Sequence, residues 1–238
     1  MLHLWNTNEI IINCNLVAIN KIKAILIKIL KIRKKGINNM SQQEFWNNKF
    51  SRDGFLYGLK PNTFISSKIK LFDKNSKVLC IGEGEGRNAI FFAKRGFDVT
   101  AVDASDIGLL KLQQRAKEEN LNIHTLCMDL NHWEVKDKYD VIVASYLHMY
   151  KEEREELFGK IEKSLNEKAY FIGEFFSTKQ VNYKSGGPRD EDLLYTIDDF
   201  KKSFSLCDKD IKEEVTILDE GKGHQGEACV IRVIIQKL

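Results

Sequence analysis

Hydrophobic and polar positions follow two different periods along most of the chain. From residue 77 onward, short apolar runs are separated by segments in which apolar residues recur at helical spacing. Short apolar runs bounded by turn residues predict buried strands, and the segments between them predict amphipathic helices. The expected strands are 77–82, 97–105, 123–130, 139–149 and 168–176, and the expected helices are 87–96, 106–120, 152–165 and 196–205.

The end of the chain departs from this alternation. The runs 211–221 and 226–237 both have strand character, and the short segment 222–225 between them predicts an antiparallel hairpin. Strands that alternate with helices form a parallel sheet with helices on both faces. We therefore expect an α/β fold with a doubly wound, mostly parallel, Rossmann-like sheet of seven strands that ends in an antiparallel hairpin.

The beginning of the chain has a pattern of its own. Over residues 16–35, lysines collect on one half of a helical wheel, and isoleucines and leucines collect on the other. A spanning helix needs about 20 apolar residues with few charges, so the lysines exclude a helix that crosses a membrane. A helix that lies on an anionic membrane surface is the one membrane role that stays physically possible. We expect residues 1–39 to be a basic extension outside the fold. Residues 40–238 then form a single domain, with 40–66 as an aromatic lid segment.

Charge is divided unevenly along the chain. Residues 1–39 hold seven of the 37 Lys and Arg but one of the 34 Asp and Glu, so they carry +6 and the rest carries −3. A mildly acidic main body lacks the basic excess of a nucleic-acid-binding domain, and no nucleic-acid partner is expected.

Five cysteines without paired spacing indicate neither a disulfide framework nor a zinc site. We expect a cytoplasmic protein without a bound metal.

A glycine-rich segment, IGEGEGRN at residues 81–88, joins the first predicted strand to the first predicted helix. In open α/β sheets, ligands bind outside the carboxyl ends of the strands, near the point where the strand order reverses. Glycine permits the backbone angles and the close approach that such a site requires. Gly82, Gly84 and Gly86 are therefore predicted to border a ligand.

Two classes of ligand fit the spacing of this loop. The pattern G-x-G-x-x-A over residues 84–89, with Asp103 nineteen residues after its first glycine, also matches a dinucleotide fingerprint. A nicotinamide-dependent oxidoreductase is therefore one alternative. A dinucleotide presents a diphosphate, which Glu83 and Glu85 would repel at a cost of about 1–4 kcal/mol. S-adenosylmethionine presents a sulfonium, an ammonium and one carboxylate that Arg87 could hold, so the acidic loop favours it.

Acidic residues also end the second and third predicted strands. Asp103, followed by Ala104, can accept both hydroxyls of an adenosine ribose. Asp129 can accept the adenine amino group, and Leu130 offers its backbone and an apolar contact. Ser145, at the end of the fourth strand, completes the candidate cofactor contacts. Aspartate is common at strand ends as a turn former, so neither acid alone indicates a cofactor site. The indication comes from the glycine loop, Asp103 and Asp129 together, which lie in three consecutive strand–helix units.

These motifs resemble a known family. The stretches VLCIGEGEGRNAIFFAKRGFDVTAVDAS, YDVIVASYLHM, SGGPRDEDLLYT and GKGHQGEACVIRV are similar to class I methyltransferases of the tellurite-resistance type, and more distantly to thiopurine methyltransferases. The similarity runs from about Phe45 to the end of the chain. Many class I enzymes have an acid at the position of Cys80, so here Glu83 or Glu85 would steady the cofactor's ammonium. The resemblance implies S-adenosylmethionine as the cofactor, bound by Gly82, Gly84, Gly86, Asp103 and Asp129.

Methyl transfer from a sulfonium is a displacement in which the cofactor supplies the reactive carbon. The protein orients donor and acceptor and excludes water. The expected acceptor is a small molecule with a soft nucleophile, either a thiol or a selenium or tellurium oxyanion. The candidate catalytic residues are His148, near the end of the fourth strand, and His224, in the predicted hairpin loop; relatives have a histidine in a comparable segment that is thought to serve the substrate. The alternatives are packed histidines and a noncatalytic cofactor-binding module.

Overall fold

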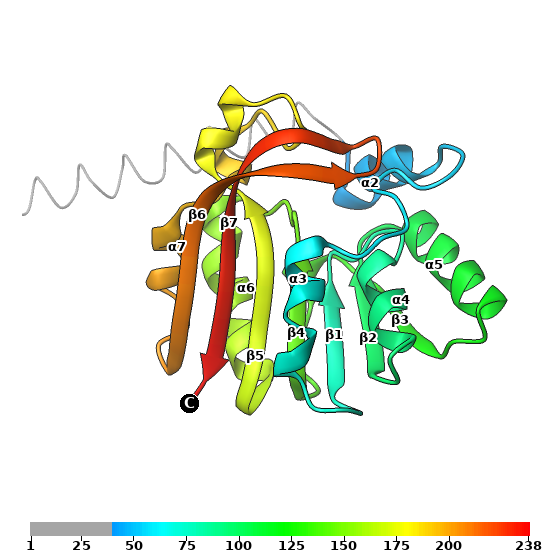
Figure 1. Ribbon diagram of the computed structural model, residues 1–238, viewed down its shortest axis with the longest axis horizontal. Coiled ribbons are helices and arrows are strands. Elements are labelled where there is room, and N and C mark those ends of the chain that lie inside the picture. Colours follow the sequence, from blue (N-terminus) through cyan, green and yellow to red (C-terminus); the bar gives the residue numbers. More distant parts are fainter. Residues whose placement is uncertain (1–39) are drawn as a thin grey trace, which may run out of the picture. The chain divides into compact units, whose positions relative to one another are not determined.

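The computed structural model describes residues 40–238, so the expectations for residues 1–39 lie outside the described part. Residues 42–238 form one compact unit. Its sheet has the order β3-β2-β1-β4-β5-β7-β6, and β7 is antiparallel to both of its neighbours (Figure 1). The mostly parallel, seven-stranded sheet with a terminal hairpin is thus confirmed. The strands are β1 (Lys77–Ile81), β2 (Asp98–Asp103), β3 (Ile123–Cys127), β4 (Tyr139–Ser145), β5 (Leu165–Phe176), β6 (Cys207–Glu220) and β7 (His224–Lys237).

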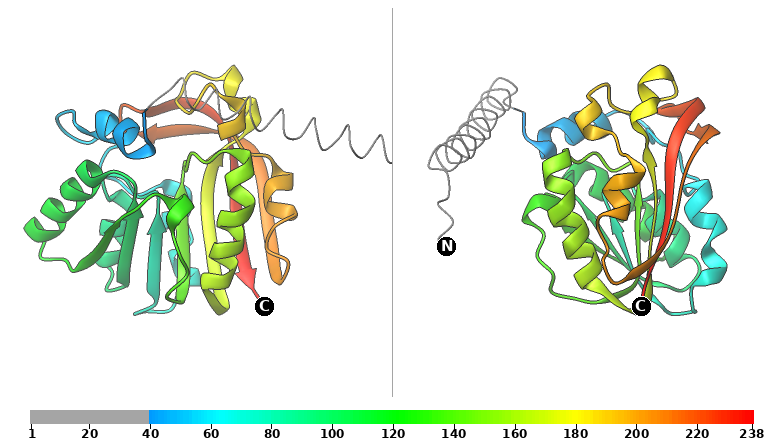
Figure 2. Two further views of the ribbon diagram at one scale, coloured as in Figure 1. Left: turned by 180° about the vertical axis from the view of Figure 1, so that it is seen from behind. Right: turned by 90° about the vertical axis from the view of Figure 1, so that its left-hand side faces the viewer.

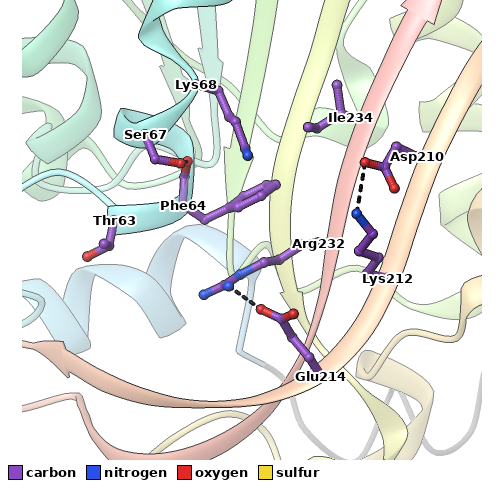
Figure 3. Close-up of a pocket in the computed structure, with 9 residues that line it drawn as sticks. All are labelled: Thr63, Phe64, Ser67, Lys68, Asp210, Lys212, Glu214, Arg232 and Ile234. Atoms are coloured by element: carbon purple, nitrogen blue, oxygen red, sulfur yellow. Dashed lines mark hydrogen bonds and ion pairs between the residues drawn. The ribbon is translucent and has the colours of Figure 1, made fainter.

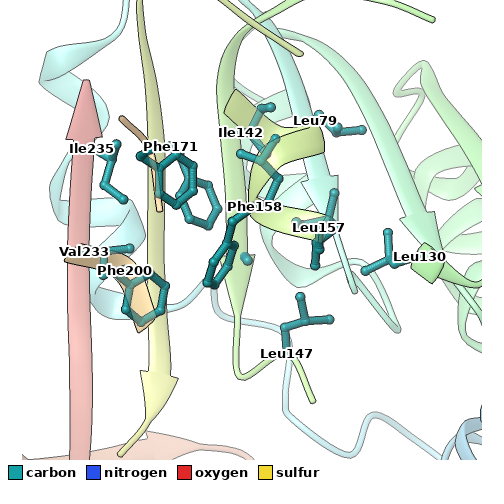
Figure 4. Close-up of a cluster of buried hydrophobic side chains, with 14 of the residues drawn as sticks. Leu79, Leu130, Ile142, Leu147, Leu157, Phe158, Phe171, Phe200, Val233 and Ile235 are labelled. Carbon is teal, nitrogen blue, oxygen red and sulfur yellow. The ribbon is translucent and has the colours of Figure 1, made fainter. Parts of the chain in front are cut away.

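Helices cover both faces of the sheet (Figure 2). Helices α3, α4 and α5 pack on one face, around Val78 and Cys80 of β1. Helices α6 and α7 pack on the other, where Phe158 and Phe200 meet Phe171 of β5 (Figure 4). The α-helices are α2 (Gln42–Phe50), α3 (Thr63–Ser67), α4 (Arg87–Ala93), α5 (Asp106–Glu118), α6 (Lys151–Ser164) and α7 (Ile197–Lys201), and the 3-10 helices are η1 (Ile69–Leu71), η2 (Leu130–His132), η3 (Thr178–Asn182) and η4 (Glu191–Leu193).

The central strands are apolar throughout because both of their faces are covered. Val78 and Cys80 face one helical layer, and Leu79 and Ile81 face the other. Strand order reverses between β1 and β4, so the loops that leave these two strands lie at the same edge of the sheet. The long hairpin of β6 and β7 extends past that edge toward the segment that follows α2 (Figure 1).

The third strand was expected to extend to residue 130, but it ends at Cys127, before Asp129. Two other wrong boundaries concern candidate catalytic residues. Strand β4 ends at Ser145 because Tyr146 adopts a φ of 51°, which extended structure does not allow, so His148 lies beyond the strand. Pairing of β6 with β7 continues to Glu220 and His224, so His224 begins a strand and does not lie in the hairpin loop. Within the described residues, no helix has the length and apolar character needed to cross a membrane.

Candidate functional site

The glycine loop makes a tight turn that other segments approach closely. Gly82 and Gly84 both have a φ of 59°, a conformation that favours glycine. A Cβ on Gly82 would lie 2.6 Å from Cδ1 of Leu147, and one on Gly84 would lie 2.9 Å from Cζ of Phe50. The glycines therefore allow both the loop after β4 and the lid helix α2 to reach the end of β1.

Glu83 caps the helix that follows the loop. Its Oε1 accepts hydrogen bonds from the backbone N–H groups of Asn88 and Ala89, each at 2.7 Å. These N–H groups have no partner within the helix, and a carboxylate there also meets the positive end of the helix dipole. Burial raises the pKa of Glu83 to about 7 despite these bonds. A diphosphate would bind the same N–H groups, so the protein's own carboxylate occupies the place that a dinucleotide requires.

Glu85 holds the lid segment instead of lining the cavity. Its Oε2 accepts a hydrogen bond from the N–H of Leu56 at 2.7 Å, and its Oε1 lies 2.7 Å from Nζ of Lys111. Both contacts tie the glycine loop to its neighbours, the lid segment and α5. Of the two glutamates considered for the cofactor's ammonium, Glu83 borders the cavity and Glu85 does not.

Asp103 lies at the end of β2, directly beside the glycine loop. Its Oδ2 accepts the N–H of Gly84 and its Oδ1 accepts the N–H of Ser105, each at 2.7 Å. Burial raises the pKa of Asp103 to about 6. Each carboxylate oxygen has a second lone pair, so Asp103 can still accept a hydroxyl from a ligand in the cavity that it lines.

Four of the predicted contacts lie outside the lining of this cavity. Asp129 accepts the N–H of Asn131 at 2.9 Å and caps η2, while Leu130 packs in the hydrophobic core. Ala104 follows Asp103, and Gly86 is the N-cap of α4; neither residue lines the cavity. These four are brought to the correct edge of the sheet, but not to the cavity wall.

The cavity is enclosed by segments that are far apart in the sequence. Its volume is about 60 Å³, well below the roughly 300–1,000 Å³ of sites for small ligands. A molecule of cofactor size therefore enters only if lid residues such as Trp46 and Phe50 move. The lining residues are Trp46, Phe50, Tyr57, Gly82, Glu83, Gly84, Arg87, Asp103, Ser145, Tyr146, Leu147, His148 and His224.

Both candidate histidines border the cavity. The ring of His224 lies 4.3 Å from the rings of Tyr57 and Tyr146 and 5.0 Å from that of Phe176, measured between centroids. Burial lowers the pKa of His148 to about 4 and lowers that of His224 well below its ordinary value, so both imidazoles are uncharged at neutral pH. Nε2 of His148 and Nδ1 of His224 are buried and have no hydrogen-bond partner within the described residues.

Arg87 is the cationic side chain among the described residues that line the cavity. It is 7% exposed, and its NH1 lies 2.7 Å from Oε2 of Glu220. The two groups form an ion pair, and neither atom has a hydrogen-bond partner within the part of the chain that the structure describes. A buried guanidinium with a free N–H is a suitable donor for a carboxylate.

A buried polar network supports the floor of the cavity. Glu174 is 1% exposed, and it accepts hydrogen bonds from Nδ2 of Asn62 at 2.7 Å and from the hydroxyl of Tyr146 at 2.5 Å. Nε of Arg232 donates to its other oxygen at 2.5 Å. The backbone N–H of Tyr146 also donates to the carbonyl of Glu174. Hydrogen bonds from both the backbone and the side chain of Tyr146 therefore hold its unusual backbone conformation. The ring of Tyr146 is thereby held against His224.

A larger hollow of about 290 Å³ lies on the β6–β7 hairpin beside α3 (Figure 3). Four of its charged groups pair with one another, Lys212 with Asp210 and Arg232 with Glu214, and Lys68 lies over the ring of Phe64. Buried groups with shifted pKa values mark functional sites better than size does. The smaller cavity at the glycine loop is therefore the candidate site. The hollow is lined by Thr63, Phe64, Ser67, Lys68, Asp210, Lys212, Glu214, Arg232 and Ile234.

The sequence did not single out several residues of the site. Trp46, Phe50 and Tyr57 belong to the aromatic-rich lid segment. The aromatic content of this segment is the signal from which each of them could have been predicted to line the cavity. Glu220 and Glu174 are single acids within strands. Nothing local distinguishes them, because their partners come from distant parts of the chain.

The fold is that of the Rossmann-like class I methyltransferases. The structure is similar to the crystal structure of TehB from Haemophilus influenzae, with a TM-score of 0.62 and 19% identity over 83% of this chain and 68% of that one. It is also similar to the N-methyltransferase NodS from Bradyrhizobium japonicum WM9 in complex with S-adenosyl-L-homocysteine, with a TM-score of 0.62 and 12% identity over 82% of this chain and 98% of that one.

The particular family follows from the sequence. The family of tellurite resistance protein TehB matches residues 42–173, and the chain belongs to this family, as its motifs predicted. A protein of Haemophilus influenzae strain ATCC 51907, described as a probable S-adenosyl-L-methionine-dependent methyltransferase TehB, is 36% identical over 74 residues. That match covers 31% of this chain and 26% of the relative, so the chain spans about a quarter of the length of the curated relatives that it matches.

Proposed function

We propose that the chain is an S-adenosylmethionine-dependent methyltransferase of small molecules, and that its acceptor is a soft nucleophile such as a thiol or a selenium or tellurium oxyanion. One observation carries this proposal. The carboxylates of Glu83 and Asp103 and the buried guanidinium of Arg87 border one cavity, and the adjoining helix N-terminus is already capped. This set of charges suits a ligand with an ammonium, a sulfonium and a single carboxylate, and it does not suit a diphosphate.

Each group of the cofactor has a candidate partner in the cavity. Asp103 would accept the ribose hydroxyls, Arg87 would hold the carboxylate, and Glu83 would face the ammonium. Gly82 and Gly84 lack a Cβ, which would meet Leu147 and Phe50 at the edge of the cavity. Adenine contacts of Asp129 and Leu130, together with contacts of Gly86, Ala104 and Ser145, complete the proposed set. The cofactor, when bound, supplies an electrophilic methyl group.

The protein's own part in this reaction is to orient the acceptor and exclude water. Trp46, Phe50 and Tyr57 of the lid segment close the cavity from above the glycine loop. His148 and His224 present uncharged imidazoles to the interior, and we propose that both contact the substrate or the transferring methyl group. A soft nucleophile needs little base catalysis, so few catalytic groups are needed.

We further propose that the protein works in the cytoplasm on small molecules and not on nucleic acid. The mildly acidic composition of the main body supports the second point. The cysteines in the described part, Cys80, Cys127, Cys207 and Cys229, are all free thiols. Free thiols are compatible with a reducing compartment.

Asp103 provides the most direct test of the cofactor assignment. Asp103→Ala should weaken binding of S-adenosylhomocysteine by about 1–3 kcal/mol, because ligand hydroxyls lose a charged acceptor. Asp103→Asn keeps one acceptor oxygen and should lose less. Titration calorimetry gives both affinities, and the melting temperatures of the free variants show whether the loss of the Gly84 and Ser105 hydrogen bonds has damaged the fold. Unchanged affinity in Asp103→Ala would count against the ribose contact.

A comparison of thermal stabilisation by S-adenosylhomocysteine and by NAD distinguishes this proposal from the oxidoreductase alternative. Binding to the folded state alone raises the melting temperature. S-adenosylhomocysteine should therefore stabilise the protein and NAD should not. Stabilisation by NAD without any effect of S-adenosylhomocysteine would overturn the proposed function.

A further inference from the structure

We infer that the hollow between α3 and the β6–β7 hairpin is a second ligand site, which takes a zwitterionic α-amino acid with an apolar side chain, and that its occupancy is coupled to the cavity at the glycine loop. Such a site goes beyond the proposed function and does not depend on it. Three features of the hollow point to it: the balance of its charges, a lysine without an acidic partner, and a hydrogen-bond network that leads from its walls to the cavity.

The hollow is small, and it lies apart from the glycine loop. Its volume of about 290 Å³ is just below the roughly 300–1,000 Å³ of sites for drug-sized ligands, so it suits a smaller molecule. Residues of α3 and its C-cap form one side, and residues of the hairpin strands form the other (Figure 3). The lining residues of the hollow and those of the cavity are different throughout, so a ligand in the hollow does not occupy the cofactor's place.

The charges around the hollow balance one another. Its walls carry three cations, Lys68, Lys212 and Arg232, and two acids, Asp210 and Glu214. A third acid, Glu174, lies buried behind them and accepts a hydrogen bond from Nε of Arg232. A ligand with a net charge would disturb this balance, whereas a ligand with one charge of each sign preserves it. Complementary charge of this kind selects among ligands, so the hollow favours a zwitterion.

Lys68 is the cation that can bind the ligand's carboxylate. Each nitrogen of the Arg232 guanidinium already donates, to Glu174, Glu214 and Thr216. Lys68 is half-buried, and within the described residues it pairs with no carboxylate. Its Nζ lies 5.1 Å from the centroid of the Phe64 ring, which holds the ammonium at the hollow by a cation–π contact. The N–H groups of Lys68 therefore stay available for a ligand.

The strand side of the hollow can bind the ligand's ammonium. Asp210 pairs with Lys212 at 3.2 Å, but both side chains are more than half exposed, so this pair is weak. Glu214 contacts Arg232 through Oε1, so its Oε2 can accept a further donor. Ile234 adds apolar surface beside these groups. An ammonium, a carboxylate and an apolar side chain each find a partner here, and an apolar α-amino acid carries all three.

The walls of the hollow are joined to the cavity through Asn62 and Glu174. Oδ1 of Asn62 accepts the N–H of Ile65 at 3.0 Å and caps α3, and its Nδ2 donates to Glu174 at 2.7 Å. Glu174 also accepts Nε of Arg232 and the hydroxyl of Tyr146, which lines the cavity. A ligand that bridges α3 and β6 should hold this network in place. It should thereby pre-organise the Tyr146 wall and tighten binding in the cavity.

Leucine and two analogues that each lack one charge test the ligand class. The cavity of the full chain is first filled with S-adenosylhomocysteine, because the methionine part of this molecule is itself an amino acid. In titration calorimetry leucine should bind, and isocaproate and isoamylamine should each bind about tenfold more weakly or less, as the loss of a hydrogen bond to a charged group predicts. Absence of leucine binding, or an equal affinity for either analogue, overturns the inference.

Lys68→Met tests the place of binding. It should weaken leucine binding by about tenfold, because the carboxylate loses its charged donor, and the melting temperature of the free variant shows whether the fold persists. Lys70→Met is the matched control: Lys70 is an exposed lysine of η1 that does not line the hollow, so leucine should bind this variant as it binds the native protein. Native affinity for leucine in Lys68→Met overturns the assignment of the site.

The coupling is measured as the affinity for S-adenosylhomocysteine with and without saturating leucine. Leucine should tighten it by about fivefold, the lower end of common allosteric effects, and by reciprocity S-adenosylhomocysteine should tighten leucine binding by the same factor. Unchanged or weaker affinity overturns the coupling, and mutual exclusion of the two ligands places leucine in the cavity and overturns the site. Failure of the proposed function has a different signature, because S-adenosylhomocysteine would then not bind while leucine would still distinguish Lys68→Met from the native protein.

Discussion

The two sides of the cavity are built in different ways. On the glycine-loop side, the carboxylates of Glu83 and Asp103 are each met by backbone N–H groups of the glycine loop, of α4 or of the turn after β2. On the hairpin side, His224 is surrounded by rings such as Tyr57 and Tyr146, which come from distant segments. The local backbone thus satisfies the carboxylates of the glycine-loop side, whereas on the hairpin side tertiary packing brings together the aromatic rings and the distant side chains that satisfy Glu174.

This difference has a consequence for mutations. On the glycine-loop side, the groups proposed to bind the cofactor also hold the turn together, so stability and binding should be lost together. On the hairpin side, the groups around His224 complete an already folded core, so activity should be lost with little loss of stability. Measurements of stability and activity in variants of the two sides can therefore test whether the glycine-loop side also serves the fold and whether the hairpin side serves activity alone.

The largest effect on stability is expected at Glu83. Glu83→Ala should lower the free energy of unfolding by about 3 kcal/mol, because the buried N–H groups of Asn88 and Ala89 lose their acceptor and α4 loses its cap. Denaturant unfolding measures this change. A loss below about 1 kcal/mol, the value of an ordinary exposed cap, would show that the carboxylate is not what holds this turn.

Glu83→Gln separates the cap from the charge. Its amide oxygen can still accept the two N–H groups, so its free energy of unfolding should stay within about 1 kcal/mol of the native value. Its affinity for S-adenosylmethionine should fall, because the ammonium would lose a charged partner. Equal destabilisation by Gln and by Ala would contradict this separation.

The sequence predicted the glycine-loop side well, for a physical reason. The strand β1, the turn at Gly82 to Gly86 and the acid at Asp103 all follow from local patterns, since turn conformation and strand burial depend on adjacent residues. Even there, the role of Glu83 was not predicted as a cap. The motif suggested a ligand contact, whereas the carboxylate also accepts hydrogen bonds from its own helix.

The hairpin side was predicted less well because its geometry depends on distant partners. Tyr146 ends β4 early, since its backbone and its hydroxyl both bind Glu174 on the neighbouring strand. His224 was expected in a loop, but pairing with Glu220 extends the strand to include it. Neither partner can be recognised from the residues around Tyr146 or His224 alone.

Gly223→Ala should be the sharpest test of the hairpin side. An added Cβ would lie 2.4 Å from Cε1 of Tyr57, and the N–H of Gly223 donates to the carbonyl of Leu56 at 3.1 Å. The substitution should push the lid segment away from His224. We expect kcat/KM to fall by about 100-fold, as displacements near 1 Å can cause, while the free energy of unfolding changes by about 1 kcal/mol or less.

Gly159→Ala is the matched control for that variant. Gly159 lies in α6, and an added Cβ there would meet no atom within 4 Å. Alanine should stabilise the helix by about 0.5–1 kcal/mol and leave kcat/KM unchanged. If Gly223→Ala instead lost stability and kept its activity, the hairpin turn would serve the fold and not the site.

The smallest expected effect is the pH dependence of cofactor affinity. Burial raises the pKa of Glu83 to about 7 and that of Asp103 to about 6, so the free protein holds protons on these groups that ordinary carboxyls would have released. A cationic ligand favours their ionised forms and lowers both pKa values, so binding releases protons. Affinity for S-adenosylmethionine should therefore rise with pH, by about tenfold between pH 5 and 7.5, which corresponds to about 1.4 kcal/mol.

Binding isolates these carboxylates better than unfolding does, because the histidines act on unfolding with the opposite sign. Raised carboxyl pKa values give stability that is present at low pH and lost as pH rises toward 7. The lowered pKa values of His148 and His224 give stability that is present above about pH 6.5 and lost as pH falls. Both imidazoles are uncharged at neutral pH in the free protein, and a cationic ligand would lower their pKa values further, so they contribute little to the binding measurement. Calorimetry in buffers of different ionisation enthalpy counts the released protons, and Glu83→Gln should remove most of the pH dependence. A pH-independent affinity in the native protein would mean that the carboxylates on the glycine-loop side serve the turn alone.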